Sequence, residues 1–277
     1  MGVKGENFIM NKYYPTYLQT FVLFLIFIPC ILISILIVFP FASIENGIGL
    51  ALISIISMLL TVSAGLTLRK DWRLKISSFP LAIIFLSVLF IIVMHILIDP
   101  LNEIFPAPES LIKVFRALLL QPYAAFFYIV ISAPILEEVL FRGIILDGYL
   151  KNYKPWQGII VSAFLFALIH GNLAQGLGAF GIGILFGWLY WKTNSIIPSI
   201  ILHFINNAVA FVGMLTTPEE DINKSIRESL DNDFTFSMLY AFSIIIAVGS
   251  VWLLHTKYLS KMAIERAEPK EELTIEI

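Results

Sequence analysis

Charged side chains are scarce in this sequence. Lys, Arg, Asp and Glu together make up 14% of the 277 residues, whereas soluble domains carry about 25%. The hydrophobic fraction is 58% and the mean hydropathy is +0.88, so the apolar surface exceeds what a core of this size can bury. These values exclude a soluble globular protein and indicate that the bilayer is the solvent.

The chain has only one cysteine and no excess of positive charge. The single cysteine, Cys30, excludes a framework of disulfides within the chain. A net charge of −2 and a pI near 6.1 leave no polycationic surface, so nucleic acid is not expected as a partner. Membrane lipid is the expected partner of the protein surface.

Long uncharged runs divide the chain into candidate membrane spans. A bilayer core about 30 Å thick requires roughly 20 apolar residues in a helix. The runs that approach or reach this length are 17–40, 47–68, 80–98, 122–150, 156–169, 173–191, 195–215 and 234–254. We therefore predict an all-α fold: a polytopic membrane helix bundle with about eight transmembrane helices.

The distribution of Lys and Arg predicts the orientation of this bundle, because positive residues are retained on the cytoplasmic side. The segments on the side of the two termini carry 13 of the 18 Lys and Arg residues, and the opposite side carries 4. The last one, Arg142, lies inside a span. Both termini are therefore expected to be cytoplasmic.

The chain divides by character into three parts of one integral membrane domain. Residues 1–121 hold N-terminal transmembrane helices, whose reactive side chains are His95 and the single cysteine, and a surface segment at about 99–116. Residues 122–215 carry the polar chemistry and form the expected catalytic helical core. Residues 216–277 are expected to form the last loop, the final transmembrane helix and a charged cytoplasmic tail.

The surface segment and a glycine stripe each carry a structural expectation. Leu111, Ile112 and Phe115 form an apolar pattern that predicts a helix lying on the membrane surface. Gly183 and Gly187 are four residues apart, a spacing that lets membrane helices pack closely, so we expect a packing seam there.

Ionisable residues interrupt the fourth span. Charges at membrane depth cost about 2.5 to 3.5 kcal/mol each on insertion scales, so they usually mark a pathway or a site. Glu138 and Arg142 are four residues apart on one helix face and can form an ion pair. Glu137 points about 100° away round the helix and lacks that partner, which predicts a functional role. The alternative is that both glutamates share Arg142 as a bond between helices.

Two later spans carry polar residues at helical spacing. Phe166 and His170 share a face, and so do His203 and Asn207, with Asn206 close to the latter face. Each pair alone is typical of polar contacts between membrane helices.

The depths of these residues agree. Counted from cytoplasmic lysines at 1.5 Å per residue, Glu137 lies roughly 21 Å deep, His170 roughly 24 Å, and His203 and Asn207 roughly 16 and 22 Å. A carboxylate, two imidazoles and a carboxamide can therefore meet at one level inside the bundle.

This combination of groups supports the activation of water. A carboxylate in a low dielectric can act as a general base, while imidazole and carboxamide donors can stabilise an oxyanion. Glu137, His170 and His203 are also candidate ligands for a zinc with an open position, although the H-E-x-x-H pattern is absent. Zinc and a metal-free, glutamate-activated water both remain open at this point.

Three motifs in order resemble the CPBP intramembrane proteases, which include type II CAAX prenyl endopeptidases and bacterial abortive-infection and bacteriocin-related membrane proteins. Glu137-Glu138-x-x-x-Arg142 is similar to the E-E-x-x-x-R motif of that family. Phe166-x-x-x-His170 is similar to its F-x-x-x-H, and a third motif, H-x-x-x-N, begins at position 203. The matching region, about 122–212, covers a third of the chain.

The resemblance implies an eight-helix membrane bundle in the cytoplasmic membrane of a prokaryote, with endopeptidase activity that is either metal-dependent or metal-free. It implies that Glu137 and His170 activate water and that His203 and Asn207 stabilise the oxyanion. Supporting roles then belong to Glu138, Arg142 and Phe166. The implied substrate is a peptide or protein at the membrane: a prenylated CAAX protein, a bacteriocin precursor or another membrane peptide.

Non-enzymatic functions remain as alternatives. The buried Glu and His cluster could be structural in an immunity or scaffold protein of the membrane. It could also relay protons in a proton-coupled transporter, although the sequence shows no persuasive inverted repeat.

Overall fold

The computed structural model describes residues 13–42, 47–218, 221–230 and 232–262, and the regular elements in these ranges are all helical. In chain order the elements are α1 (Tyr17–Val38), α2 (Gly47–Arg69), α3 (Ala82–Ile104), α4 (Glu109–Leu119), α5 (Pro122–Phe126), η1 (Phe127–Ser132), α6 (Ala133–Glu138), η2 (Val139–Leu146), α7 (Asp147–Asn152), α8 (Pro155–Leu168), α9 (Leu173–Thr193), α10 (Ile197–Thr216), α11 (Ile226–Leu230), α12 (Asp233–Leu253) and η4 (Leu254–Leu259). The elements marked η are π-helical turns.

The helical membrane fold predicted from the sequence is confirmed. Within the described residues, seven helices are long and apolar enough to cross a membrane. The eighth predicted span is the shorter apolar helix α8, with 14 residues. The protein is therefore an integral, multi-pass membrane protein, while the cytoplasmic placement of its termini stays a prediction.

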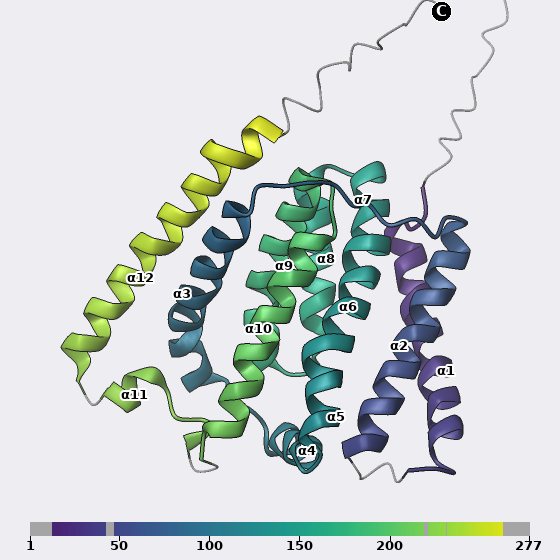
Figure 1. Ribbon diagram of the computed structural model, residues 1–277, viewed down its shortest axis with the longest axis horizontal. Coiled ribbons are helices and arrows are strands. Elements are labelled where there is room, and N and C mark those ends of the chain that lie inside the picture. The colour runs from purple at the N-terminus through teal and green to yellow at the C-terminus, as the bar shows by residue number, and fades with distance from the viewer. Residues whose placement is uncertain (1–12, 43–46, 219–220, 231, 263–277) are drawn as a thin grey trace, which may run out of the picture.

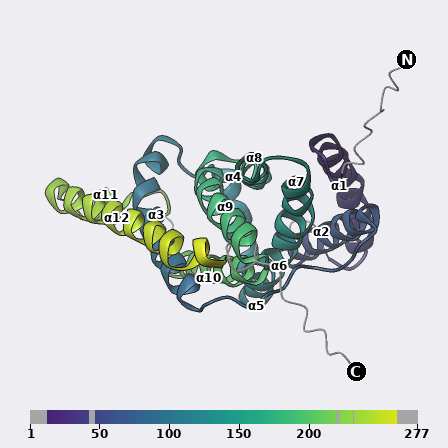
Figure 2. The ribbon, with the colours of Figure 1, turned by 90° about the horizontal axis from the view of Figure 1, so that it is seen from above.

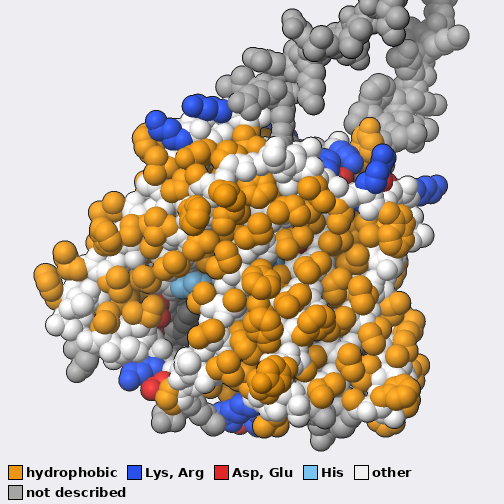
Figure 3. Space-filling model, in the orientation of Figure 1, with side chains coloured by type: hydrophobic (Ala, Val, Ile, Leu, Met, Phe, Trp, Pro, Cys, Tyr) orange, Lys and Arg blue, Asp and Glu red, His pale blue; other side chains and the backbone are white. Residues whose placement is uncertain are grey.

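The long helices run roughly parallel to one another (Figure 1). Seen from above, α3 and α12 form one end of an elongated bundle, α1 and α2 form the other, and α6 to α10 lie between them (Figure 2). Hydrophobic side chains cover a broad band of the face in Figure 3, and Lys and Arg gather above and below that band. This distribution is the one that a bilayer requires of a helical bundle.

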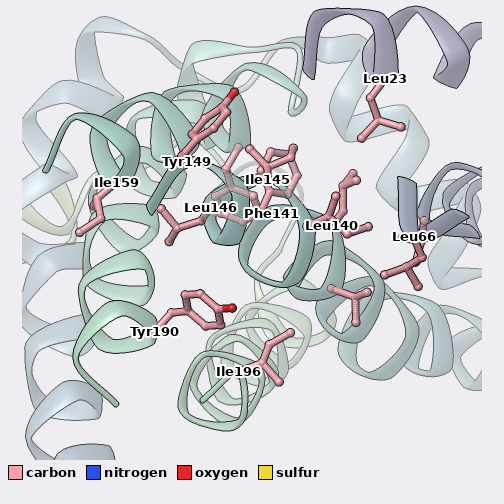
Figure 4. Packing of buried hydrophobic residues seen from close by; sticks show 14 of the residues in the cluster. Leu23, Leu66, Leu140, Phe141, Ile145, Leu146, Tyr149, Ile159, Tyr190 and Ile196 are labelled. Atoms are coloured by element: carbon pink, nitrogen blue, oxygen red, sulfur yellow. The ribbon is translucent and has the colours of Figure 1, made fainter. Parts of the chain in front are cut away.

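The helix 122–152, which joins α5 to α7, lies at the centre of the packing. All residues of its η2 turn are buried. Phe141 and Ile145 from this helix pack with Leu23 of α1 and Leu66 of α2, and Tyr190 of α9 belongs to the same cluster (Figure 4). A helix that is surrounded by others must be apolar on every side, which explains why its few polar residues are conspicuous.

The glycine seam predicted between residues 183 and 187 is present between α8 and α9. A Cβ atom on Gly183 would lie 3.1 Å from the Cβ of Ala163, and one on Gly187 would lie 3.1 Å from the Cγ2 of Ile159. The absence of side chains at both positions therefore allows the two helices to approach closely.

The segment expected to lie outside the membrane, 99–116, begins later in the structure than predicted. Helix α3 continues to Ile104, and Asp99 is buried, where its carboxylate accepts the backbone N–H of Ile226 at 3.0 Å. Leu111 and Phe115 of α4 are partly buried and line a cavity. The placement of α4 on the membrane surface stays a prediction.

Candidate active site

Glu138 and Arg142 form a fully buried ion pair in the central helix. Both side chains are 0% exposed, and Arg142 Nη1 donates to Glu138 Oε1 at 2.8 Å. Arg142 Nη2 donates to the backbone carbonyl of Gly183 in α9 at 3.0 Å. The predicted i, i+4 pair is thus present, and it also ties the central helix to α9.

His203 of α10 joins the same carboxylate. Its Nδ1 lies 2.9 Å from Glu138 Oε1, and the residue is 4% exposed. Because a carboxylate only accepts hydrogen bonds, Nδ1 carries the proton. The ring of Phe166 packs edge-on against His203, with centroids 5.6 Å apart, and lies 4.8 Å from the guanidinium carbon of Arg142. Glu138, Arg142 and Phe166 therefore hold His203 in one orientation.

Glu137 has a different environment from its neighbour. Its side chain is 17% exposed, and its Oε2 lies 3.8 Å from His203 Nε2. That distance is too long for a direct hydrogen bond but matches two groups that share a water molecule. Within the described residues, Arg142 donates hydrogen bonds to Glu138 and to the Gly183 carbonyl and none to Glu137, so the two glutamates do not share it.

His170 follows the end of α8, and one of its ring nitrogens forms a hydrogen bond with that helix. Its Nδ1 lies 2.9 Å from the carbonyl oxygen of Phe166, one turn earlier, so Nδ1 is again the donor. The Nε2 atom of a neutral ring is then an acceptor. Asn172 holds the chain beyond α8, because its Nδ2 donates to the His170 carbonyl at 2.8 Å and its side chain caps α9.

Asn207 of α10 is fixed by the central helix. Its Nδ2 donates to the backbone carbonyl of Ile129 at 2.9 Å, and its Oδ1 accepts from Asn206 Nδ2 at 3.2 Å. The Oδ1 atom of Asn206 in turn lies 3.2 Å from His95 Nε2 on α3. The carboxamide therefore belongs to a chain of hydrogen bonds that reaches a helix far away in the sequence.

A cavity of about 450 Å³ collects most of the predicted site residues. Glu137, Phe166, His170, His203 and Asn207 all line it, whereas Glu138 and Arg142 lie behind its wall. Figure 3 shows a histidine at a hollow in the apolar face of the molecule. The agreement in depth that the sequence predicts is thus matched by one shared cavity.

Several polar residues of this cavity were missed as site residues in the sequence. His95, Gln175 and Asn206 also line it. Asn206 was visible beside the H-x-x-x-N motif, and His95 was visible as an isolated polar residue of an otherwise apolar span. Only the packing of α3 against α10 brings the two together.

A second cavity of about 290 Å³ adjoins the first at Glu137. It is lined mainly by apolar side chains of α1 and α2, such as Phe24, Ile53 and Met58. Tyr128 and Ala133 line both cavities, as Glu137 does. Glu137 therefore lies between the cavity that holds the predicted site residues and the mainly apolar second cavity.

Comparison with known proteins concerns the part of the chain that carries this geometry. Residues 119–209, which contain all three motifs, match the family described as type II CAAX prenyl endopeptidase Rce1-like. The resemblance predicted from the motifs is confirmed. This Rce1-like segment supplies the central helix together with α8, α9 and most of α10.

Two curated bacterial proteins are similar to the chain. The membrane-embedded CAAX protease MroQ of Staphylococcus aureus is 31% identical over 125 residues, which cover 43% of this chain and 49% of that protein. The putative membrane peptidase YdiL of Bacillus subtilis is 29% identical over 85 residues, or 31% and 35% of the two chains. The chain thus matches about half or less of the length of these relatives. No solved structure gives a significant match.

Glu137, His170 and His203 are the candidate zinc ligands predicted from the sequence. Within the described residues, no three His, Cys, Asp or Glu side chains gather closely enough to hold a metal ion. Glu137, His170 and His203 share the cavity without forming such a set. A role for zinc therefore stays a prediction that elemental analysis can test.

Proposed function

We propose that this protein is an intramembrane endopeptidase that hydrolyses a peptide bond of a membrane-associated substrate with water activated by Glu137. The observation that carries the proposal is the contrast between two adjacent carboxylates. Glu138 is bound by Arg142 at 2.8 Å and by His203 at 2.9 Å, while Glu137 lines the cavity and lies 3.8 Å from His203 Nε2. A base that must accept a proton from water needs this freedom.

The attacking water would lie between Glu137 and His170. Glu137 accepts one proton of the water, and Nε2 of a neutral His170 accepts the hydrogen bond of the other. The water oxygen then attacks the carbonyl carbon of the scissile bond. Glu137 subsequently passes its proton to the nitrogen of the scissile bond. The C–N bond then breaks as the oxyanion re-forms the carbonyl, which releases an amine and a carboxylic acid.

The oxyanion that forms needs donors on the opposite side of the carbonyl. Asn207 lines the cavity and uses one N–H for Ile129, which leaves its second N–H for the oxyanion. His203 can donate from Nε2 in its imidazolium form, because Nδ1 is already directed at Glu138. The roles implied by the family resemblance are therefore compatible with the side-chain geometry.

The substrate must reach a site at membrane depth. The cavity is bounded by helices that span the membrane, and α4 lies across one end of the bundle (Figure 1). We propose that the substrate is a membrane peptide or a protein segment at the membrane. A prenylated CAAX protein and a bacteriocin precursor both belong to this class.

The proposal is tested by the Glu137→Gln variant, which keeps the size of the side chain and removes its basicity. The purified protein in liposomes is incubated with membrane peptides derived from a bacterial proteome, and the products are identified by mass spectrometry. We expect wild type to produce cleavages that Glu137→Gln abolishes. Glu109→Gln, which changes a glutamate that is 78% exposed, is the matched control and should retain them. Equal products from wild type and Glu137→Gln would overturn the proposal.

A further inference from the structure

The chain of hydrogen bonds that ends at Asn207 begins outside the Rce1-like segment, on α3. Three bonds link His95 Nε2, the Asn206 amide, the Asn207 amide and the carbonyl of Ile129, with distances of 3.2, 3.2 and 2.9 Å. His95 is exposed on α3 and lines the wall of the polar cavity. It is therefore a candidate for a role in the site that the sequence motifs do not contain.

The last group in this series of hydrogen bonds is the backbone carbonyl of Ile129, which accepts no hydrogen bond within its own helix. In an α-helix the Ile129 carbonyl would accept the N–H of Ala133, but in the π-helical turn η1 that N–H is directed to Tyr128. The next possible donor, five residues along, is Pro134, which has no N–H. The Ile129 carbonyl is thus left without a donor in its own helix, and Asn207 satisfies it from α10.

This carbonyl determines which atom of each side chain donates and which accepts along the series of hydrogen bonds from Ile129 to His95. Because it can only accept, the end of the Asn207 side chain that faces it must be the NH2 group. The other end, Oδ1, can then only accept, so Asn206 must present its NH2 group there. Asn206 Oδ1 is consequently directed at His95, which must donate from Nε2. One backbone acceptor therefore removes the usual ambiguity between the oxygen and nitrogen of both amides.

We infer that His95 is a positioning residue of the proposed peptidase, which orients the Asn207 carboxamide through Asn206 so that an N–H faces the oxyanion. This inference rests on the proposed function of the site. Without the donor at His95, the Asn206 amide can rotate away from Asn207 Oδ1, and the Asn207 carboxamide is then held only by its hydrogen bond to Ile129. The carboxamide can tilt about that one bond, so that its second N–H no longer points steadily at the oxyanion.

The first test separates this role from simple packing. The steady-state cleavage of the most abundant peptide product found with wild type is measured for His95→Leu and His95→Gln. We expect His95→Leu to lower kcat roughly tenfold or more, as the loss of an outer hydrogen-bond partner does elsewhere, with KM little changed. Gln carries a donor close to the place of Nε2, so His95→Gln should restore most of kcat. His255→Leu, a histidine outside the cavity lining, should match wild type.

The second test asks whether His95 acts through Asn207. In the Asn207→Ala background, His95→Leu should cause no further loss of kcat, because the group that it orients is gone. Equal losses in both backgrounds, or a kcat of His95→Leu equal to wild type, would overturn the inference. Cleavage that is insensitive to Glu137→Gln would instead contradict the proposed function, so the two failures are distinguishable.

A third measurement does not depend on cleavage. Nitrogen-15 NMR of histidine-labelled protein, with the His95 signals assigned by their loss in His95→Gln, reports which ring nitrogen carries the proton. The inference requires a proton on Nε2. A neutral ring protonated on Nδ1 alone would overturn it, even if no substrate had been found.

Discussion

Glu137 and Glu138 are neighbours in the sequence, yet their carboxylates have opposite surroundings. Successive helix positions differ by about 100° in direction, so one side chain enters the cavity while the other is buried against α9 and α10. Glu138 binds Arg142 and His203 at 2.8 and 2.9 Å. A single pair of identical residues thus provides a structural anchor and a candidate base.

The anchor predicts a large effect on stability. Arg142→Met should lower the free energy of unfolding by about 3 to 5 kcal/mol, because Glu138 keeps a buried charge that has lost its partner. Unfolding of the purified protein in detergent micelles measures this loss. Arg227→Met removes an arginine whose ion pair with Asp233 is exposed, and it should leave stability nearly unchanged. Similar stability for the two variants would contradict the anchoring role.

The separation of the candidate ligands predicts the response to metal removal. The described residues include no group of three potential ligands at metal-binding distance, so we expect cleavage to persist after exhaustive chelation. Elemental analysis of the purified protein should find well below one zinc per chain. One zinc per chain that is lost in His170→Ala, together with inactivation by the chelator, would contradict this expectation.

At the scale of elements, α8 and α9 pack closely because Gly183 and Gly187 have no side chains. The carbonyl of Gly183 also accepts from Arg142, so the seam between these helices supports the site directly. A Cβ atom at this position would lie 3.1 Å from the Cβ of Ala163 and 3.3 Å from the Cδ1 of Phe166. The ring of Phe166 in turn contacts Arg142 and His203.

A larger residue in the seam should therefore affect both stability and activity. Gly183→Leu is expected to cost about 1 to 3 kcal/mol of stability by overpacking and to lower cleavage by displacing Phe166. Thermal unfolding and the rate of peptide cleavage measure the two effects. The control is Gly249→Leu in α12, where an added Cβ would meet no atom within 4 Å. A Gly183→Leu protein as stable and active as this control would show that the seam is not tight.

At the scale of the whole molecule, the asymmetry of Lys and Arg predicts which end of the bundle faces the cytoplasm. The α7–α8 connection and the α11 segment lie at opposite ends (Figure 1). The single cysteine, Cys30, is buried, so we expect it to react little with a thiol label. New cysteines at two exposed lysines, Lys154 and Lys224, therefore report the orientation.

Labelling with a membrane-impermeant maleimide in intact cells tests this topology. We expect Lys224→Cys to react in intact cells and Lys154→Cys to react only after permeabilisation. The positive-inside rule is the physical reason, because basic loops are retained in the cytoplasm. The opposite pattern would place both termini outside and would reverse the predicted orientation.

Much of the fold and part of the site could be predicted from the sequence because they depend on local geometry. Eight apolar runs indicated the helices, since span length and hydropathy are properties of consecutive residues. The Glu138 to Arg142 pair followed from the helical repeat, and a common depth for Glu137, His170 and Asn207 followed from the rise per residue. The division of the chain at residues 121 and 215 remains a prediction.

Other features were decided by the tertiary structure, because they depend on how each helix is rotated and which helix lies beside it. Distant segments are joined by the bond from His203 to Glu138, by the cavity that α4 helps to line, and by the hydrogen bonds from His95 to Asn207. No repeat in the sequence specifies such pairings. They result from the packing of whole helices, in which the polar groups of the membrane interior must find one another.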